Sequence, residues 1–420
     1  MVRRLAVVAF IVLAILALSA AFGIPGPSDR LAEPTTLTSL PRIAPATPAP
    51  TSAPPTTVVP VALPARDVPL EPKPDPDAPP PSIADGFVGI GVVTIPLGGA
   101  DLISSPGEAP FVRARQGLVF PAQGQDGDWI RILTMCDEEA WVNVAEVHAT
   151  APEPPREIGA GFSMRDAVVV IDPGHGGPNI GTSSPDGSLL EKAVNVDIAL
   201  RVRDLLEMAH TVDWETGTLY VGDAVPAVKR VLMTRVGSGE SADYEAGLIY
   251  RARLANASGG NVMVSIHNNA GWEVSLSHPG SDVYYQSQLE ASRRLGELLV
   301  EEFQRSFAQF EADWVGAIEW GAKSRLSARD GVSQYYGILR RSQIPTVIAE
   351  GAYLANPTEA ALLATPEFRQ AYAGAVYRAI VRFLTTDDVA ATPSFDPIVW
   401  AGFAGSGDPV STCTVPAQGE

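Results

Sequence analysis

The chain has 420 residues, including 37 prolines and 38 glycines, and its formal net charge is −18. So large a negative charge excludes binding to nucleic acid, or to an acidic membrane face, through bulk electrostatics. The length allows two or three domains, but the proline and glycine content is too high for one compact core throughout. Part of the chain is therefore expected to be a linker.

Residues 1–22 have the composition of a signal peptide or membrane anchor. Arg3 and Arg4 precede an uninterrupted apolar run over residues 5–22, which is the order of charge and hydrophobicity found in export signals. The run is just long enough to span a bilayer, so it is either cleaved or retained as an anchor. We expect an exported protein that is extracellular, in the cell wall, or anchored in the membrane and facing outward.

Residues 23–85 are dominated by Pro, Ala, Thr, Ser and Leu and contain almost no aromatic residue. Such a segment cannot bury enough apolar surface to offset the entropy of ordering, so it is predicted to be a disordered, Pro-rich linker. An extended spacer of about 60 residues reaches on the order of 150 to 190 Å. That reach would carry a folded domain from a membrane into a wall layer.

Residues 86–150 change to short apolar runs separated by Gly, Pro and Asp, which is typical of a small all-β barrel. Trp129 and Trp141 are expected to be core residues of this barrel rather than ligand contacts. Three pieces of the region resemble bacterial SH3-like wall-targeting domains: residues 104–107, 128–132 and 140–142.

Residues 165–385 alternate between predicted strands and helices, which indicates an α/β domain with a mostly parallel sheet flanked by helices. Its last helix is predicted to begin with Thr365 as N-cap and Pro366 at the first position. Residues 386–420 look like a tail that at best docks on the surface. The strand candidates are residues 167–171, 230–233, 262–266, 281–285 and 345–349.

The two cysteines, Cys136 and Cys413, are expected in an oxidising compartment because the protein is predicted to be exported. A disulfide between them would tie the C-terminal tail to the small barrel. The sequence spacing does not show whether the two thiols meet, so the pairing stays open.

Three apolar strands each run into a side chain that can bind a metal or act as an acid. These side chains are His175, His267 and Glu350, and Glu191 begins the first long helix after the His175 loop. Because ligands bind at the carboxyl ends of parallel strands, the four groups are expected to converge. Taken singly, such a histidine is more often a loop residue, and such a glutamate more often stabilises the helix dipole. Two imidazoles and one carboxylate together are the ligand set of a catalytic zinc.

At this point the chain resembles the zinc-dependent N-acetylmuramoyl-L-alanine amidase family (amidase type 3). The resemblance implies one Zn²⁺ per catalytic domain, held by His175, Glu191 and His267, with Glu350 as the catalytic carboxylate. No other cofactor is expected. The motifs that carry the resemblance are residues 171–177, 191–192, 234–235, 251 with 254–256, 265–269 and 349–357.

Other residues near these motifs have weaker assignments. Asp172, Asn256 and Arg251 are candidates to orient the ligands or contact substrate, although an Asp before proline and a helix-end Asn also have purely structural uses. Asn268 is expected to be a loop residue without a role. The remaining histidines, His148, His210 and His278, are expected on the surface or in loops, with a small chance that His278 touches substrate.

The implied function is hydrolysis of the amide between N-acetylmuramic acid and L-alanine in peptidoglycan, used in wall remodelling or cell separation. Two features depart from the family pattern: Gly351 stands where a bulkier apolar residue is frequent, and residues 313–331 form a long Trp-containing segment. That segment could be a substrate wall, or a lid that an activator protein displaces. One rival interpretation is a non-catalytic wall-binding module, but none of the expected metal ligands or the base is replaced. The other is a zinc peptidase, but the His-Glu-x-x-His motif of the commonest such enzymes is absent.

Overall fold

The structure is a computed structural model, and all the residues it describes belong to the second of two units of the chain, Pro74–Glu420. The predicted signal or anchor and most of the predicted linker therefore lie outside the described residues. None of the helices within the described ranges is long and apolar enough to cross a membrane. The described ranges are residues 91–154, 156–236, 246–271, 280–310, 321–400 and 413–419.

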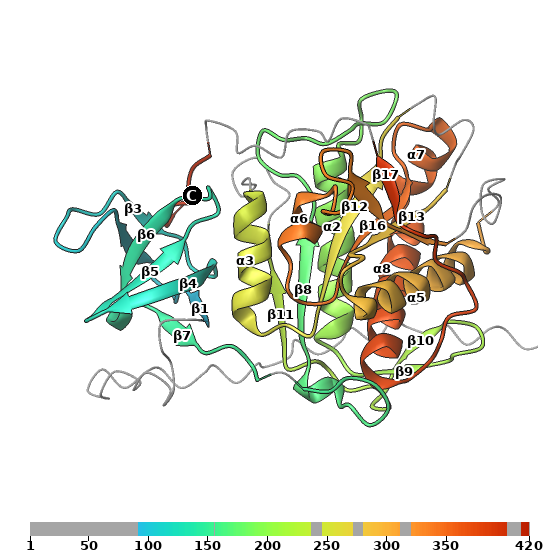
Figure 1. Ribbon diagram of the computed structural model, residues 1–420, viewed down its shortest axis with the longest axis horizontal. Coiled ribbons are helices and arrows are strands. Elements are labelled where there is room, and N and C mark those ends of the chain that lie inside the picture. Colours follow the sequence, from blue (N-terminus) through green and yellow to red (C-terminus); the bar gives the residue numbers. More distant parts are fainter. Residues whose placement is uncertain are drawn as a thin grey trace, which may run out of the picture. The chain divides into compact units, whose positions relative to one another are not determined.

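Residues 91–150, called the β-domain below, form an antiparallel sheet with strand order β3-β2-β6-β5-β4-β1-β7 in the described part of the chain (Figure 1). Its inward side chains, among them Phe120, Ile130 and Val142, are fully buried in one apolar cluster. The strands are β1 (Gly91–Thr94), β2 (Ala100–Ile103), β3 (Val112–Ala114), β4 (Val119–Asp126), β5 (Trp129–Leu133), β6 (Glu139–Asn143) and β7 (His148–Thr150).

The expectation that Trp129 and Trp141 are core residues is wrong. Both are only partly buried and lie outside the apolar cluster of the β-domain. Strand alternation explains the result: Arg131 is the register partner of Trp141, so both tryptophans share the outward face with Arg131. The inward face of the same hairpin carries Ile130 and Ile132 instead.

The second sheet confirms the prediction of a mostly parallel α/β architecture. Its strand order is β11-β8-β12-β16-β13-β14 among the described residues, and β13 runs antiparallel to β16 while the other pairs are parallel. The strands are β8 (Val168–Pro173), β11 (Arg230–Met233), β12 (Val262–Asn269), β13 (Asp282–Tyr285), β14 (Ala322–Lys323) and β16 (Thr346–Tyr353).

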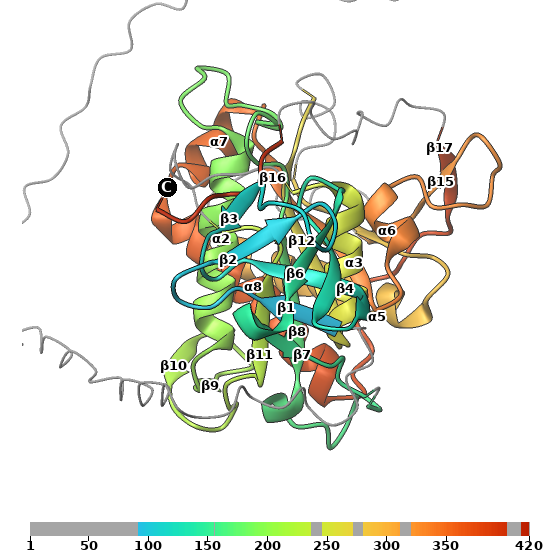
Figure 2. The same ribbon diagram turned by 90° about the vertical axis from the view of Figure 1, so that its left-hand side faces the viewer.

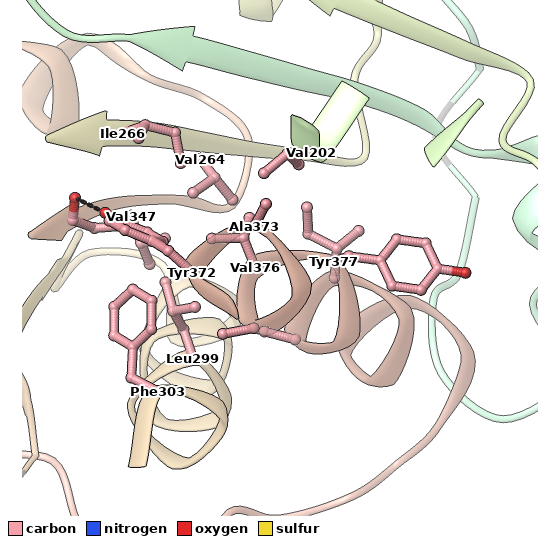
Figure 3. Close-up of a cluster of buried hydrophobic side chains, with 14 of the residues drawn as sticks. Val202, Val264, Ile266, Leu299, Phe303, Val347, Tyr372, Ala373, Val376 and Tyr377 are labelled. Atoms are coloured by element: carbon pink, nitrogen blue, oxygen red, sulfur yellow. Dashed lines mark hydrogen bonds between the residues drawn. The ribbon is translucent and has the colours of Figure 1, made fainter. Parts of the chain in front are cut away.

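Helices cover both faces of this sheet (Figures 1 and 2). The larger core lies between one face and the helices α2 (Glu191–Leu206), α5 (Glu290–Phe307) and α8 (Pro366–Thr385). There, Leu299 and Phe303 of α5 pack with Tyr372 and Val376 of α8 (Figure 3). The helices α3 (Leu248–Ser258) and α6 (Gly337–Arg341) pack on the opposite face.

The start of α8 confirms the predicted cap. The Thr365 side chain accepts a hydrogen bond from the backbone N–H of Phe368, and Pro366 is the first helical residue. Proline is suited to this position because its missing N–H would have no partner inside the helix. The apolar stripe of α8, formed by Phe368, Tyr372, Val376 and Ile380, is buried against α5 and the sheet.

The described parts of the C-terminal tail are joined to both sheets. Ser394 bridges to Ala322 of β14, and strand β17 (Ile398–Trp400) pairs with β15 (Arg325–Ser327) in a separate two-stranded sheet. Farther on, Cys413 forms a disulfide with Cys136, and Ala417 bridges to Ala114 of β3. The disulfide that the sequence left open is thus present.

The helix α7 (Pro357–Leu363) carries a buried carboxyl group close to the end of β16. Glu359 Oε2 accepts hydrogen bonds from the backbone N–H groups of Tyr353 (2.6 Å) and Gly280 (3.3 Å). Its other oxygen is buried without a partner among the described residues. Burial raises the pKa of Glu359 to about 8.

This pKa predicts a pH-dependent stability. In the unfolded chain Glu359 loses its proton near its ordinary pKa of about 4.3, whereas the folded chain keeps the proton up to about pH 8. The free energy of unfolding should therefore fall as pH rises from about 5 to 8. In Glu359→Gln, chemical denaturation across this range should show a smaller fall than in the wild type. Glu367→Gln, an exposed change in the first turn of α8, is the matched control, and equal slopes in all three proteins would contradict the prediction.

Candidate metal centre

The site lies at the edge where parallel strands of the second sheet end. Glu350 of β16 is the register partner of His267 of β12, so both side chains point to the same face of the sheet. His175 follows β8 by two residues, and Glu191 is the first residue of α2. The structure thus brings to one edge the four residues that the sequence singles out.

The carboxylate of Glu191 lies between the two imidazoles. Its Oε2 atom is 3.1 Å from His175 Nε2, and its Oε1 atom is 3.1 Å from His267 Nδ1. The two imidazole rings are 4.9 Å apart between centroids and nearly perpendicular, with 77° between their planes. One ligand atom from each residue can be chosen so that all three lie within 4.8 Å of one another.

Backbone and side-chain amide groups donate hydrogen bonds to the Glu191 carboxylate. Oε1 accepts hydrogen bonds from the backbone N–H of Asn268 (3.1 Å) and the side-chain amide of Asn195 (3.2 Å). Oε2 accepts one from the backbone N–H of Thr182 (3.0 Å). These donors favour the ionised form of a carboxylate whose side chain is only 4% exposed.

Glu191, His175 and His267 also shift one another's pKa. Burial opposes ionisation of Glu191, but the contacts with His175 and His267 hold its pKa well below its usual value. Burial likewise opposes protonation of His175, whose pKa Glu191 nevertheless raises. Burial lowers the pKa of His267. Metal binding requires an ionised carboxylate and neutral imidazoles, so the pKa shifts of Glu191 and His267 favour it, whereas that of His175 opposes it.

His175 is held at both its ring and its backbone. Its Nδ1 atom lies 2.9 Å from Asn179 Oδ1, an acceptor that favours the proton on this nitrogen, so that Nε2 can offer its lone pair to a metal ion. Its backbone adopts φ 62°, which is uncommon for a residue other than glycine. Strained residues of this kind persist where the surroundings over-determine them, as they do at functional sites.

Two glycines make room for the ligands. A Cβ atom on Gly174 would lie 2.2 Å from His267 Nε2, and one on Gly181 would lie 2.3 Å from Glu191 Oε2. Gly181 also has φ +72°, which favours glycine on its own account. No larger side chain fits at either position without displacing a ligand.

A buried network anchors the chain between β8 and His175. Asp172, which is 1% exposed, accepts hydrogen bonds of 2.5 Å each from Arg251, Thr234 and Ser265. The same Arg251 guanidinium donates to the backbone carbonyls of Pro173 (2.7 Å) and His175 (2.7 Å). Its charge and the hydrogen bonds keep the pKa of Asp172 low although burial acts in the opposite direction.

Glu350 stands beside the three-residue cluster without belonging to it. It is flanked in register by His267 on one side and by Asp282 of β13 on the other. Its Oε2 atom is buried and has no hydrogen-bond partner among the described residues. Burial, together with the negative charges of Glu191 and Asp282, raises the pKa of Glu350 well above its usual value. A carboxyl group with a raised pKa holds its proton more readily, which suits proton transfer.

The cluster fits a divalent metal ion. It offers two imidazole nitrogens and one carboxylate oxygen, and the side chains of His175 and His267 remain 24% and 21% exposed. The exposed imidazoles leave a side of the site open, whereas Glu191 closes the other. Three protein ligands with one open position are typical of catalytic rather than structural zinc.

Two assignments from the sequence need correction. Asn256 donates to the carbonyl of Arg341 (3.0 Å) and accepts from the N–H of Gln343 (2.8 Å), so it joins α3 to the segment after α6 instead of orienting a ligand. Asn268 is not a loop residue: it lies in β12, is 1% exposed, and donates to Asn195 as well as to Glu191.

Sequence reasoning missed three residues that support the site. Asn179 orients His175, Asn195 supports Glu191 from one turn along α2, and the Tyr372 hydroxyl contacts the carbonyl of His267 at 3.0 Å. The spacing of four residues between Asn195 and Glu191 was a usable signal, because such pairs face each other on a helix. Tyr372 could not be identified in this way, because in the sequence it is one more residue of the apolar stripe of α8.

The other histidines separate into three cases. His148 is exposed in β7. His210, expected on the surface or in a loop, is 6% exposed in β9 (His210–Val212), which pairs with β10 (Leu219–Val221), and its ring packs on Tyr377. Its Nε2 atom lies 3.0 Å from the carbonyl oxygen of Leu205, which gives the buried ring a polar partner. His278 lies outside the described residues.

The two departures from the family pattern have different outcomes. A Cβ on Gly351 would lie 2.1 Å from the Tyr372 ring, so in this chain the tyrosine fills the space that a bulkier residue would occupy. Within residues 313–331, residues 313–320 lie outside the described part. The following residues form β14, at the edge of the second sheet, and β15.

Comparison with known proteins places this geometry in a family context. A family profile described as N-acetylmuramoyl-L-alanine amidase matches residues 169–382, just over half of the chain. The germination-specific N-acetylmuramoyl-L-alanine amidase of Bacillus subtilis (strain 168) is 28% identical over 229 residues, which cover 52% of this chain and 80% of that protein. N-acetylmuramoyl-L-alanine amidase Rv3717 of Mycobacterium tuberculosis (strain ATCC 25618 / H37Rv) is 28% identical over 230 residues, covering 52% and 87%. The solved catalytic domain of CwlV, N-acetylmuramoyl-L-alanine amidase from Bacillus (Paenibacillus) polymyxa var. colistinus, is 25% identical, with coverage of 52% and 97% and a TM-score of 0.38.

The close approach of Gly181 to Glu191 predicts a selective loss of metal affinity. Gly181→Ala should displace the Glu191 carboxylate and weaken Zn²⁺ binding by about tenfold or more, as measured by competition with a chromogenic chelator. Gly187→Ala is the matched control, because Gly187 has nearly the same φ (+73°) but open space where its Cβ would stand. Equal Zn²⁺ affinities of the two variants would contradict the prediction.

Proposed function

Because this chain belongs to the N-acetylmuramoyl-L-alanine amidase family, we propose that it hydrolyses the amide between N-acetylmuramic acid and L-alanine of peptidoglycan with one zinc ion. His175, Glu191 and His267 would hold the ion. The observation that carries this proposal is the Glu191 carboxylate, which lies 3.1 Å from each imidazole at an open sheet edge. The two curated amidases of similar sequence support the choice of substrate.

The chemistry follows from the difficulty of the bond. An amide is a poor electrophile, and a bound zinc ion supplies the Lewis acidity that polarises its carbonyl and acidifies water. Glu350 is the proposed general base, which takes a proton from the attacking water and delivers it to the leaving amine nitrogen. Its raised pKa and its buried Oε2 without a partner among the described residues suit a group that must both accept and return a proton.

Two carboxylates of the same site thus take opposite roles. Glu191 is surrounded by donors that keep it ionised, which suits a ligand. Glu350 is flanked by the negative Asp282 and Glu191, which suits proton transfer. A pair of carboxyl groups whose surroundings push their pKa values apart is a usual mark of divided acid and base roles.

The residues around the ligands act by positioning. Arg251 and Asp172 hold the chain that carries His175, while Asn179 fixes the ring of His175. Asn195 and Asn268 fix the carboxylate of Glu191. Such supporting contacts to metal ligands commonly change metal affinity or activity 10- to 100-fold when they are lost.

We further propose how the rest of the chain serves this enzyme. Residues 1–22 would export or anchor it, residues 23–85 would act as a spacer, and residues 86–150 would be an SH3-like wall-binding domain ahead of the catalytic domain at residues 165–385 and the tail at 386–420. The partly exposed Trp129 and Trp141 support a binding role for the β-domain, because aromatic residues on an outward face can contact a wall ligand. The proposed role is wall remodelling or cell separation. Residues 313–331 are a candidate lid, which an activator protein would displace.

Product analysis of purified peptidoglycan tests the proposal. The full chain should release new alanine amino termini together with intact muramyl lactate, and a zinc chelator should abolish this release. Glu350→Gln should lower the rate by about 10² to 10⁴-fold while keeping Zn²⁺ bound, because it removes the base and spares the ligands. Glu207→Gln, an exposed change at the end of α2, is the matched control. Release of other ends, or full activity of Glu350→Gln, would contradict the proposal.

A further inference from the structure

Helix α3 is shared between the β-domain and the second sheet. Tyr250 and Leu254 belong to the apolar core of the β-domain, and the Tyr250 hydroxyl donates to the carbonyl of Val119 in β4 (2.6 Å). On its other side, Ala255 of the same helix packs with Val168 and other residues of the second sheet. Figure 1 shows α3 between the two sheets. A displacement of α3 would therefore change the packing of both the β-domain and the second sheet.

The β-domain also supplies the N-terminal cap of α3. The N-cap residue is Gly247, which has no side chain with which to cap the helix. Asp137, from the turn between β5 and β6, takes this place: Oδ1 accepts from the N–H of Tyr250 (2.6 Å) and Oδ2 from the N–H of Ile249 (3.3 Å). These are the N–H groups that an N-cap side chain normally binds, and a negative charge at this end also complements the helix dipole.

The Asp137 carboxylate packs tightly against the first residues of α3. A Cβ on Gly247 would lie 2.4 Å from the Asp137 carboxylate, so only glycine admits it. The N–H of Gly247 donates to the carbonyl of Met135 in the same turn (2.6 Å). The neighbouring residue, Cys136, is held by the disulfide to Cys413. The turn is thus tied both to the helix and to the C-terminal tail.

The capped turn of α3 leads directly to the proposed metal site. Arg251 follows Tyr250 in the chain, and its guanidinium donates to Asp172 (2.5 Å), to the carbonyl of Pro173 (2.7 Å) and to the carbonyl of His175 (2.7 Å). Its Nε also donates to the carbonyl of Ala246, just before the cap (2.7 Å). Fraying of the first turn of α3 would therefore move the group that holds the backbone of His175.

We infer that Asp137 of the β-domain is a positioning residue for the metal centre, acting through the first turn of α3 and Arg251 on His175. The inference rests on the proposed function only in taking His175 as a metal ligand. It makes the β-domain more than a tether: its β5–β6 turn completes the helix that steadies the catalytic domain's metal loop. The Cys136–Cys413 disulfide holds that turn in place.

The test measures Zn²⁺ affinity of the metal-free full chain by competition with a chromogenic chelator. Asp137→Ala should weaken Zn²⁺ binding about three- to tenfold, because the helix turn under Arg251 loses its cap. Asp137→Asn should restore most of the affinity, because asparagine caps helices nearly as well as aspartate. Asp128→Ala, an exposed change in another turn of the β-domain, should leave the affinity unchanged.

Hydrogen exchange at Ile249 and Tyr250 separates positioning from a purely structural role. Asp137→Ala should speed exchange of both amides, and Gly247→Ala, which pushes the carboxylate away, should do the same and also weaken Zn²⁺ binding. Faster exchange at α3 with unchanged Zn²⁺ affinity would overturn the inference. If Asp137→Ala does not fold, Asp137→Asn and Gly247→Ala still decide it, and a wild type that binds no Zn²⁺ would refute the proposed function instead.

A double-mutant cycle tests the route. If Asp137 acts through Arg251, the effect of Asp137→Ala on Zn²⁺ affinity should largely vanish in an Arg251→Lys background, which keeps the charge but loses the forked donors. Independent, additive effects of the two changes would contradict the route.

Discussion

The buried carboxylate of Glu191 is the interaction on which the site depends. It reaches both imidazoles at 3.1 Å, and its own position is fixed by donors from Asn268, Asn195 and Thr182. Burying an ionised carboxylate without these partners would cost much free energy, so several segments of the chain must supply hydrogen-bond donors to it. This need explains the glycine at position 181 in the loop between His175 and α2, because a Cβ there would collide with Glu191 Oε2.

The β-domain and the second sheet share one helix, so the packing of each depends on the other. Each apolar face of α3 completes a different core, and its first turn is capped from outside by the β-domain. A tethered module could bind wall without affecting the catalytic domain. A module that supplies the N-terminal cap of a helix next to the His175 loop cannot be removed so freely.

Much of this site could be predicted from the sequence because His267 and Glu350 lie in the second halves of β12 and β16, His175 follows β8, and Glu191 begins α2. The order of parallel strands then brings His175, His267 and Glu350 to one edge. The supporting contacts could not be predicted in the same way. Asn268 looked like a loop residue because the end of β12 was expected at Ile266, three residues before its end at Asn269. Asp137 lies 113 residues from Tyr250, and nothing local marks it as the cap of a distant helix. The outward tryptophans were misjudged because composition, without the register, does not tell which face of a strand is buried.

The most direct test of the account is anomalous diffraction at the zinc edge from crystals of the full chain grown with Zn²⁺. The account predicts one strong peak at the second sheet's edge, bound by His175, Glu191 and His267, with Glu350 outside its coordination sphere. A peak bound by Glu350 in place of Glu191, or zinc bound elsewhere while the two imidazoles remain free of metal, would contradict it.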